Sequence, residues 1–269
     1  MAQFITFLTD FGLADDFVGT CHGVIRRIAP DAHIIDITHG IPAQQVLQGS
    51  LVLANTIPYM PSGVHLAVVD PGVGSDRRAV VLTDTSGRVY LGPDNGLLLP
   101  AADRMGGVVE AHEIANPAYA LDPISKTFHG RDIFAPAAAH ISNGVAPSEL
   151  GPPVDPAELE RLDIPEPEIG SRRIRASILY IDHFGNVQLN LRREELERVG
   201  IEPGTPLEFE HRSYGYYAVA ARTFTDARKG DIILYEDAYR NVSVAISGGD
   251  AATMLKARPG DELRIAFRE

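Results

Sequence analysis

The feature that most constrains this chain is an opening series of short apolar runs separated by helix-like segments. The run 4–8 (Phe-Ile-Thr-Phe-Leu) is almost continuously apolar rather than alternating, which is typical of a strand buried on both faces. Further strands are expected at 33–37 and 64–69, and helices at 16–28 and 44–55. This strand–helix–strand–helix–strand order predicts a mainly parallel sheet with right-handed crossovers, and so an α/β domain.

Beyond the third strand the pattern changes, and a second domain is expected. Residues 156–170 are polar and rich in Pro, and we interpret them as a linker between an N-terminal α/β catalytic domain (1–155) and a C-terminal domain (171–269). Short strands separated by turn residues predict a smaller, β-barrel-like fold for the C-terminal domain. The remaining expected elements are a hairpin at 79–83 and 88–91, strands at 108–112, 174–181, 187–191, 207–209, 232–234, 242–246 and 263–266, and helices at 132–141 and 193–199.

The charge and the cysteine count exclude several classes of protein. Lys and Arg number 24 against 36 Asp and Glu, so the net charge is −12, which disfavours nucleic acid and anionic membranes as partners. No apolar stretch approaches the roughly 18 residues of a membrane span. The single cysteine, Cys21, excludes a disulfide framework and lies in a predicted helix, where a packed thiol is expected. These features predict a cytoplasmic protein.

Common cofactor and nucleophile motifs are absent from the sequence. It contains no GxxxxGK[ST] loop, no GxGxxG fingerprint, no HExxH pair and no GxSxG elbow. We therefore expect no cofactor and no metal. A carboxylate site made of Asp10, Asp15 and Asp16 is a weak alternative.

Two acidic loops follow predicted strands at the edge where α/β sheets bind ligands. Asp10 ends the first strand in Thr-Asp-Phe-Gly, and Asp70 begins a loop, 70–78, that contains two Gly and returns Arg77 towards the acid. The alternative is a tight turn with a capping Asp and surface arginines, and local spacing leaves the two interpretations about equal.

Three further motifs have both a functional and a structural interpretation. His129 lies in Phe-His-Gly-Arg-Asp (128–132), either in a site or on the surface. The segment 92–96 (Gly-Pro-Asp-Asn-Gly) is by composition a turn. In 181–186 (Ile-Asp-His-Phe-Gly-Asn) an acid, an aromatic ring and an amide suit purine binding, but Gly-Asn also suits a hairpin turn.

Taken together, these motifs resemble those of the S-adenosyl-L-methionine (SAM) hydroxide adenosyltransferase family, relatives of the fluorinase and chlorinase that make 5′-halo-adenosines. The resemblance covers about residues 4–267, in the order LTDFG with a following DD pair, DPGVGS-x-RR, GPDNG, FHGRD and IDHFGN. It implies an α/β domain joined to a β-barrel-like domain. It also implies a homotrimer whose sites lie between one subunit's N-terminal domain and a neighbour's C-terminal domain.

The resemblance also implies roles for individual residues. The hydrolases' Asp-Arg-His set falls on Asp70, Arg77 and His129, whereas the halogenating relatives carry Tyr at the position of Asp70 and lack the His. The family's ribose-binding Asp falls on Asp10. The remaining implied substrate contacts are Asp15 near the amino-acid portion, Phe128 beside the catalytic His, Asp182 at the methionine amino group, and Phe184 and Asn186 at the adenine.

Near the C-terminus this sequence departs from the family pattern. A Ser-Ser-Gly-Tyr stretch followed by Asn-Arg-Gly is common there, but this chain has Ala-Tyr-Arg-Asn at 238–241 and Ser-Gly-Gly at 247–249. The adenosine contacts that the resemblance implies in this region fall on Tyr239, Ser243 and Ile246.

The resemblance implies that SAM is hydrolysed to adenosine and L-methionine by attack of water or hydroxide on the ribose C5′. Two alternatives remain at this point. One is a SAM-dependent 5′-halogenase, which Asp70 disfavours; the other is a sensor that binds adenosine or SAM without turnover.

Overall fold

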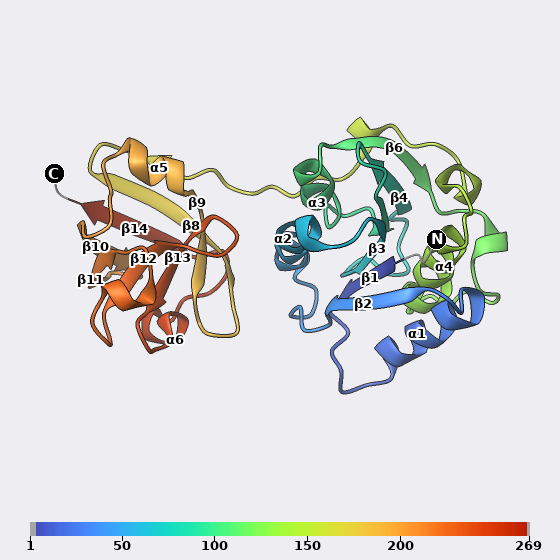
Figure 1. The fold of residues 1–269 in the computed structure, drawn as a ribbon, viewed down its shortest axis with the longest axis horizontal. Helices are drawn as coiled ribbons and strands as arrows, with labels where there is room; N and C mark the ends of the chain where they lie inside the picture. Colours follow the sequence, from blue (N-terminus) through green and yellow to red (C-terminus); the bar gives the residue numbers. More distant parts are fainter. Residues whose placement is uncertain (1–3, 268–269) are drawn as a thin grey trace. The chain divides into compact units, whose positions relative to one another are not determined.

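The computed structural model describes residues 4–267, and the chain divides into two units between Leu162 and Asp163 (Figure 1). The boundary lies inside the Pro-rich stretch 156–170 that we interpreted as a linker. Its first residues belong to the N-terminal unit, because Leu159 is buried there and the Glu160 N–H donates to Asp94. A Pro-rich composition indicates irregular backbone, but it does not reveal that one leucine anchors that backbone to the domain.

The N-terminal unit contains a sheet whose strand order, within residues 4–267, is β2-β1-β3-β5-β4-β6. Strands β1, β2, β3 and β5 are parallel, and β4 runs antiparallel to its neighbours β5 and β6, so the expected mainly parallel sheet is confirmed. The strands are β1 (Phe4–Thr9), β2 (His33–Thr38), β3 (Gly63–Val68), β4 (Ala79–Asp84), β5 (Val89–Pro93) and β6 (Val108–Glu113).

Helices cover both faces of this sheet, as Figure 1 shows for this unit. Helices α1 (Phe17–Ile28) and α4 (Ala135–Ser142) pack together on one face, and α2 (Val46–Thr56) and α3 (Leu99–Arg104) pack together on the other. Cys21 of α1 is fully buried, and burial raises the pKa of its thiol to about 12, so it is a packing residue as expected. No helix within residues 4–267 is long and apolar enough to cross a membrane.

The C-terminal unit is a closed barrel, which confirms the β-barrel-like prediction. Its described strands follow the order β14-β10-β11-β12-β13-β9-β8, and pairing of β14 with β8 closes the ring, while β7 adds to β8. The strands are β7 (Glu168–Ile169), β8 (Arg173–Ile181), β9 (Val187–Arg192), β10 (Pro206–His211), β11 (Tyr214–Ala220), β12 (Ile232–Glu236), β13 (Asn241–Ile246) and β14 (Glu262–Phe267), with helices α5 (Arg193–Arg198) and α6 (Ala251–Leu255).

Short helical turns connect several of these elements. The one that concerns the site is a π-helical turn, Gly130–Phe134, directly before α4. Short 3-10 turns lie at Ile57–Tyr59, Pro117–Tyr119, Pro147–Leu150, Pro156–Glu158 and Phe224–Asp226.

Candidate active site

The two acidic loops leave neighbouring strands, at the point where the strand order reverses. Strand β1 is followed by α1 and then by β2, which pairs with one edge of β1. Strand β2 is followed by α2 and then by β3, which pairs with the other edge of β1. Such a reversal opens a crevice beyond the carboxyl ends of the strands, where open α/β sheets bind their ligands. Asp10 follows β1 and Asp70 lies two residues beyond β3, so both are at this crevice.

Asp70, Arg77 and His129 form one hydrogen-bonded network. Arg77 Nε lies 3.0 Å from each carboxylate oxygen of Asp70, and its Nη2 also donates to Oδ2. The same Nη2 lies 2.9 Å from His129 Nδ1. The side chains of Arg77 and Asp70 are only 11% and 6% exposed, so the pair is shielded from water. Ionic hydrogen bonds are stronger in such a shielded environment than in water.

The network fixes the protonation of the imidazole. A guanidinium has only donors, so His129 Nδ1 must accept, and the neutral ring carries its proton on Nε2. Burial, and then the positive charge of Arg77, lower the pKa of His129 below its ordinary value of 6.5. Asp70, Asp132 and a backbone hydrogen bond with Ser125 oppose that shift. His129 is therefore neutral near pH 7.

Backbone geometry at Gly74 lets the loop 70–78 fold back. Gly74 has φ +79°, and a Cβ there would lie 2.4 Å from the carbonyl oxygen of Lys126. Only glycine suits both the left-handed conformation and the close approach. The loop thus packs against the segment that leads to His129, which brings Arg77 within reach of that ring.

The second arginine of the loop, Arg78, binds the Gly-Pro-Asp-Asn-Gly segment (92–96), which gives this motif a structural role. Arg78 Nε donates to Asp94 Oδ2 at 2.8 Å, and the Asp94 N–H donates to the Arg78 carbonyl at 2.9 Å. Asn95 Nδ2 donates to the carbonyl oxygen of Val69, the residue before Asp70, at 2.9 Å. The motif is therefore a support for the Asp70 loop as well as a turn.

An aromatic cluster joins the loop after β1 to the loop that carries His129. Phe128 makes edge contacts with Phe11 and Phe17, at ring-centroid distances of 5.7 and 5.1 Å. Gly130 permits this packing, because a Cβ there would lie 2.8 Å from Phe11 Cζ. Asp15, in the loop between Phe11 and Phe17, is exposed to solvent.

Asp10 is held by a backbone group that the sequence did not reveal. Its Oδ2 accepts a 2.8 Å hydrogen bond from the Gln44 N–H, and Gln44 has φ +66°. A left-handed non-glycine residue is strained, and such residues concentrate at functional sites. No local motif marks Gln44, since neither its neighbours nor its type indicate a turn of this kind.

The predicted residues of the β8–β9 connection form a tight turn around one carboxylate. Asp182 Oδ1 accepts from the N–H groups of Phe184 and Asn186, each at 2.9 Å, and Oδ2 accepts from Asn186 Nδ2 at 2.7 Å. Phe184 stands at the tip and is 75% exposed, a large apolar ring free to stack on a planar ligand. The segment is thus a hairpin turn that also presents an aromatic side chain.

A row of polar side chains crosses the barrel strands beside this turn. Tyr180 pairs with Gln188, Gln188 with Ser243, and Ser243 with Tyr235, so the four side chains share one face of the sheet. Burial, and then the negative charge of Asp182, raise the pKa of Tyr180 to about 12 and raise that of Tyr235 further. Both phenols are therefore hydrogen-bond donors at neutral pH.

The adenosine contacts expected near the C-terminus separate into two groups. The Asp237 carboxylate accepts hydrogen bonds from the Tyr239 N–H at 2.8 Å and from the Ser243 hydroxyl at 3.2 Å. Tyr239 and Ser243 therefore lie beside the polar row. Ile246 differs, because its side chain packs in the barrel core, so only its backbone can face a ligand.

The sequence did not reveal Tyr180, Tyr235 or Asp237. Alternation in β12 places Tyr235 opposite core residues Ile232 and Leu234. Tyr180, in contrast, has the parity of core residue Ile178 and reaches the polar row only through the register shift between Ile178 and Tyr180.

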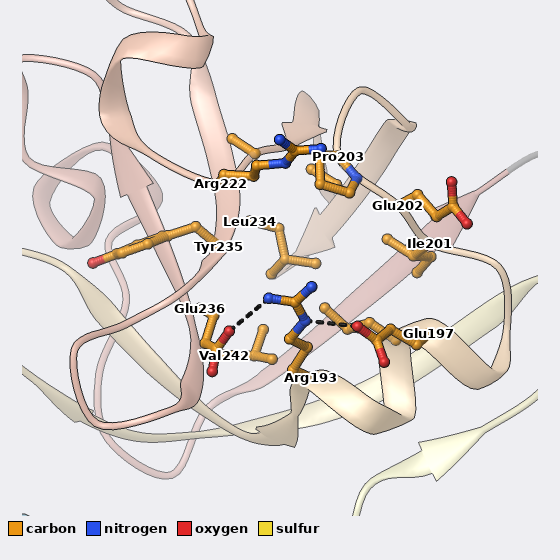
Figure 2. A pocket seen from close by; sticks show the side chains of 13 residues that line it. Arg193, Glu197, Ile201, Glu202, Pro203, Arg222, Leu234, Tyr235, Glu236 and Val242 are labelled. Carbon is orange, nitrogen blue, oxygen red and sulfur yellow. Dashed lines mark hydrogen bonds and ion pairs between the residues drawn. The ribbon is translucent and has the colours of Figure 1, made fainter.

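A second pocket of the barrel is lined mainly by other residues (Figure 2). Arg193 donates to Glu197 at 2.6 Å and to Glu236 at 2.9 Å, so its charge is neutralised inside the pocket. Of the polar row only Tyr235 reaches the lining, and Asp182, Phe184 and Asn186 do not. The pocket therefore shares one residue with the polar row and none with the 182–186 turn.

Comparisons with known proteins agree with this arrangement. Residues 5–151 match the profile of the SAM hydroxide adenosyltransferase N-terminal domain, and residues 176–264 match that of the C-terminal domain. An (R)-S-adenosyl-L-methionine hydrolase from Salinispora arenicola is 48% identical over 97% of both chains. A fluorinase from an Actinoplanes species is 26% identical over 95% of both. The crystal structure of an uncharacterised conserved protein from Thermotoga maritima has a TM-score of 0.90 and 34% identity, covering 97% of this chain and 99% of that one.

Proposed function

The chain belongs to the SAM hydroxide adenosyltransferase family, and on that premise we propose that it hydrolyses S-adenosyl-L-methionine to adenosine and L-methionine. The observation that carries the proposal is the network of Asp70, Arg77 and His129 at the sheet's switch point. The catalytic residues would be these three.

The network suits the activation of water. Asp70 orients the attacking water and takes its proton, while the oxygen forms a bond to C5′ and the C5′–S bond breaks. Arg77 holds the carboxylate with two nitrogens, and neutral His129 holds Arg77 from the other side. Alignment of nucleophile, carbon and sulfur can lower such a barrier by about 7–11 kcal/mol in the best intramolecular cases.

The leaving group needs little assistance. A sulfonium departs as a neutral thioether, so no general acid is required on that side. We propose that Asp10 binds the ribose diol, that Asp182 and Asp15 bind the amino-acid portion, and that Phe184, Asn186, Tyr239, Ser243 and the Ile246 backbone bind the adenosine. Phe128 would pack beside the reacting centre.

We also propose that the reaction needs no metal and no cofactor. Side-chain and backbone groups of the protein fill every role above. The negative charge that develops as water loses its proton and the positive charge of the sulfonium cancel as the reaction proceeds. Treatment with EDTA should therefore leave the initial rate unchanged. A rate that falls with EDTA and returns with added metal would contradict this part of the proposal.

The assembly and location are further parts of the proposal. We propose a homotrimer in the cytoplasm, with each site formed by the N-terminal domain of one subunit and the C-terminal domain of a neighbour. Support for the trimer comes from the family resemblance and from the distribution of predicted substrate residues over both units. The single buried cysteine and the net charge of −12 support a reducing, aqueous compartment.

The test is incubation of the purified protein with SAM and chromatographic separation of the products. Adenosine and methionine should accumulate in equal amounts, above the rate of spontaneous breakdown. Absence of adenosine with tight SAM binding would identify a sensor instead. A parallel reaction with chloride should yield no 5′-chloro-adenosine; formation of that product would identify a halogenase.

A further inference from the structure

We propose that His22, Asp36 and His39 form a binding site for a divalent transition-metal ion such as Zn²⁺. These residues are outside the proposed catalytic set, and no metal-site motif in the sequence marks them. They lie on α1, on edge strand β2 and directly after β2. One donor atom from each residue lies within 4.8 Å of the others.

The donor atoms are already close to coordination distances. Asp36 Oδ1 lies 2.9 Å from His22 Nε2 and 3.1 Å from His39 Nε2. Ligands about 2.0–2.1 Å from a tetrahedral Zn²⁺ stand roughly 3.3 Å from one another. An ion can therefore enter with small side-chain movements.

His39 supplies an independent indication of a ligand. Its side chain is 2% exposed, and its buried Nε2 makes no hydrogen bond, although Asp36 Oδ1 lies 3.1 Å away. A buried polar atom with no partner is costly and calls for an explanation such as an ion. Its other nitrogen, Nδ1, lies 2.8 Å from the Thr9 hydroxyl, the kind of contact that orients metal-binding histidines.

The backbone is irregular in the way that this cluster requires. In a regular strand, Asp36 and His39 would point to opposite faces, because side chains alternate. In the pairing of β1 with β2, Phe7 is opposite Asp36 but Leu8 is opposite Thr38, so β2 contains one extra residue, Ile37. This bulge, unusual in a parallel pair, turns both side chains towards α1 and His22.

The surroundings favour an ion with an open coordination position. The buried ring of Phe7 lies under the cluster, 4.9 Å from the His39 ring and 5.9 Å from the His22 ring. His22 and Asp36 are 31% and 41% exposed, so water can complete the coordination. Two imidazoles and one carboxylate suit Zn²⁺, Co²⁺ or Ni²⁺ better than Mg²⁺ or Ca²⁺. The ion would tie α1 to the edge strand.

Zinc titration of the untagged, chelator-treated full-length protein against a chromogenic indicator tests the proposal. The wild type and the control His33→Gln, an exposed histidine on the same strand, should bind one tight equivalent. His22→Gln and Asp36→Asn should each weaken that equivalent at least about tenfold. Far-UV circular dichroism and metal-free melting establish that each variant is folded.

Thermal unfolding gives a second readout. Zinc should raise the Tm of the wild type and of His33→Gln, and should not raise that of Asp36→Asn. Equal zinc affinity in the wild type, His22→Gln and Asp36→Asn would overturn the proposal. So would a wild type that binds no tight equivalent, because the three residues would then be a cluster of polar side chains that holds no ion.

Discussion

Within residues 4–267, the hydrogen bonds that the Asp70 side chain accepts come from one residue, Arg77. Three donated bonds leave a lone pair on Oδ1 for the nucleophile. Because the residue touches the attacking water in the proposed reaction and not the adenosine, its loss should affect the chemical step and spare adenosine binding.

Replacement of Asp70 by Ala should lower turnover by at least about 10²-fold, the usual contribution of a general base. Adenosine binding, measured by calorimetry, should stay within a few-fold of the wild type. Asp76→Ala, an exposed acid in the same loop, is the matched control and should retain activity. Equal turnover in the two variants would remove Asp70 from the mechanism.

Protonation of the His129 imidazole should lower the activity of the enzyme at acid pH. Its pKa lies below 6.5, so the imidazolium forms only as the pH falls below that value, and protonated Nδ1 can no longer accept from Arg77. We expect kcat/KM to be level around pH 7 and to fall in the acid range below pH 6.5. The folded state should also lose stability there, because the unfolded chain binds the proton more readily.

A pH–rate profile of His129→Gln measures that contribution. Glutamine can still accept from Arg77 but does not titrate, so the acid inflection should move or disappear while part of the activity remains. Circular dichroism at each pH separates loss of the network from unfolding. An unchanged acid inflection in the variant would show that another group sets the limit.

Among the connecting elements, the loop 70–78 depends on its glycine. Gly74→Ala adds a Cβ 2.4 Å from the Lys126 carbonyl oxygen, whereas Gly87→Ala, at the same φ of +79°, meets no atom within 4 Å. Gly87→Ala should lower the free energy of unfolding by about 1–2 kcal/mol, the penalty of a left-handed residue. Gly74→Ala should lower the free energy of unfolding, measured in urea, by more than this, and should also lower kcat. Equal losses in the two variants would contradict the close packing.

Local patterns predicted most of the elements, because each carries its own periodicity. The parallel strands and the β4–β5 hairpin were expected from residues near in sequence. The insertion of β5 between β3 and β4 was not, since strand pairing depends on contacts far along the chain. Strand β11 was missed because Tyr214, Gly215 and Tyr217 are exposed and show no apolar alternation.

The site divides in the same way. Asp70 and Arg77 lie seven residues apart in a glycine-containing loop, so their contact could be anticipated locally. The Phe-His-Gly-Arg-Asp motif marked His129 as either a site or a surface residue, and its association with Arg77, 52 residues away, came only from the family resemblance. Gln44 could not be found at all, because its contribution to Asp10 is a backbone N–H in a conformation that its side chain does not encode.

At the scale of the whole molecule, the proposed shared sites predict complementation. Asp70→Ala inactivates the N-terminal part of a site, and Phe184→Asp should inactivate the C-terminal part without disturbing folding, because Phe184 is 75% exposed. Co-expressed in equal amounts, the two inactive variants should recover about a quarter of wild-type activity, since one site in four pairs two intact halves.

Differential tags and light scattering verify that mixed trimers are present. Activity no higher than that of the two variants alone, in verified mixed trimers, would show that each site belongs to one chain. A monomer by light scattering would contradict the assembly itself.

The double attachment of the loop 70–78 has an evolutionary consequence. Arg78, Asp94 and Asn95 hold its ends through contacts that do not involve the Asp70 side chain. A substitution at position 70 therefore changes the chemistry offered to the substrate while the scaffold around it keeps its shape. Because the family resemblance implies that the halogenating relatives differ at the positions of both Asp70 and His129, an exchange at position 70 is one step between nucleophile preferences, and the attachments of the loop ends do not depend on it.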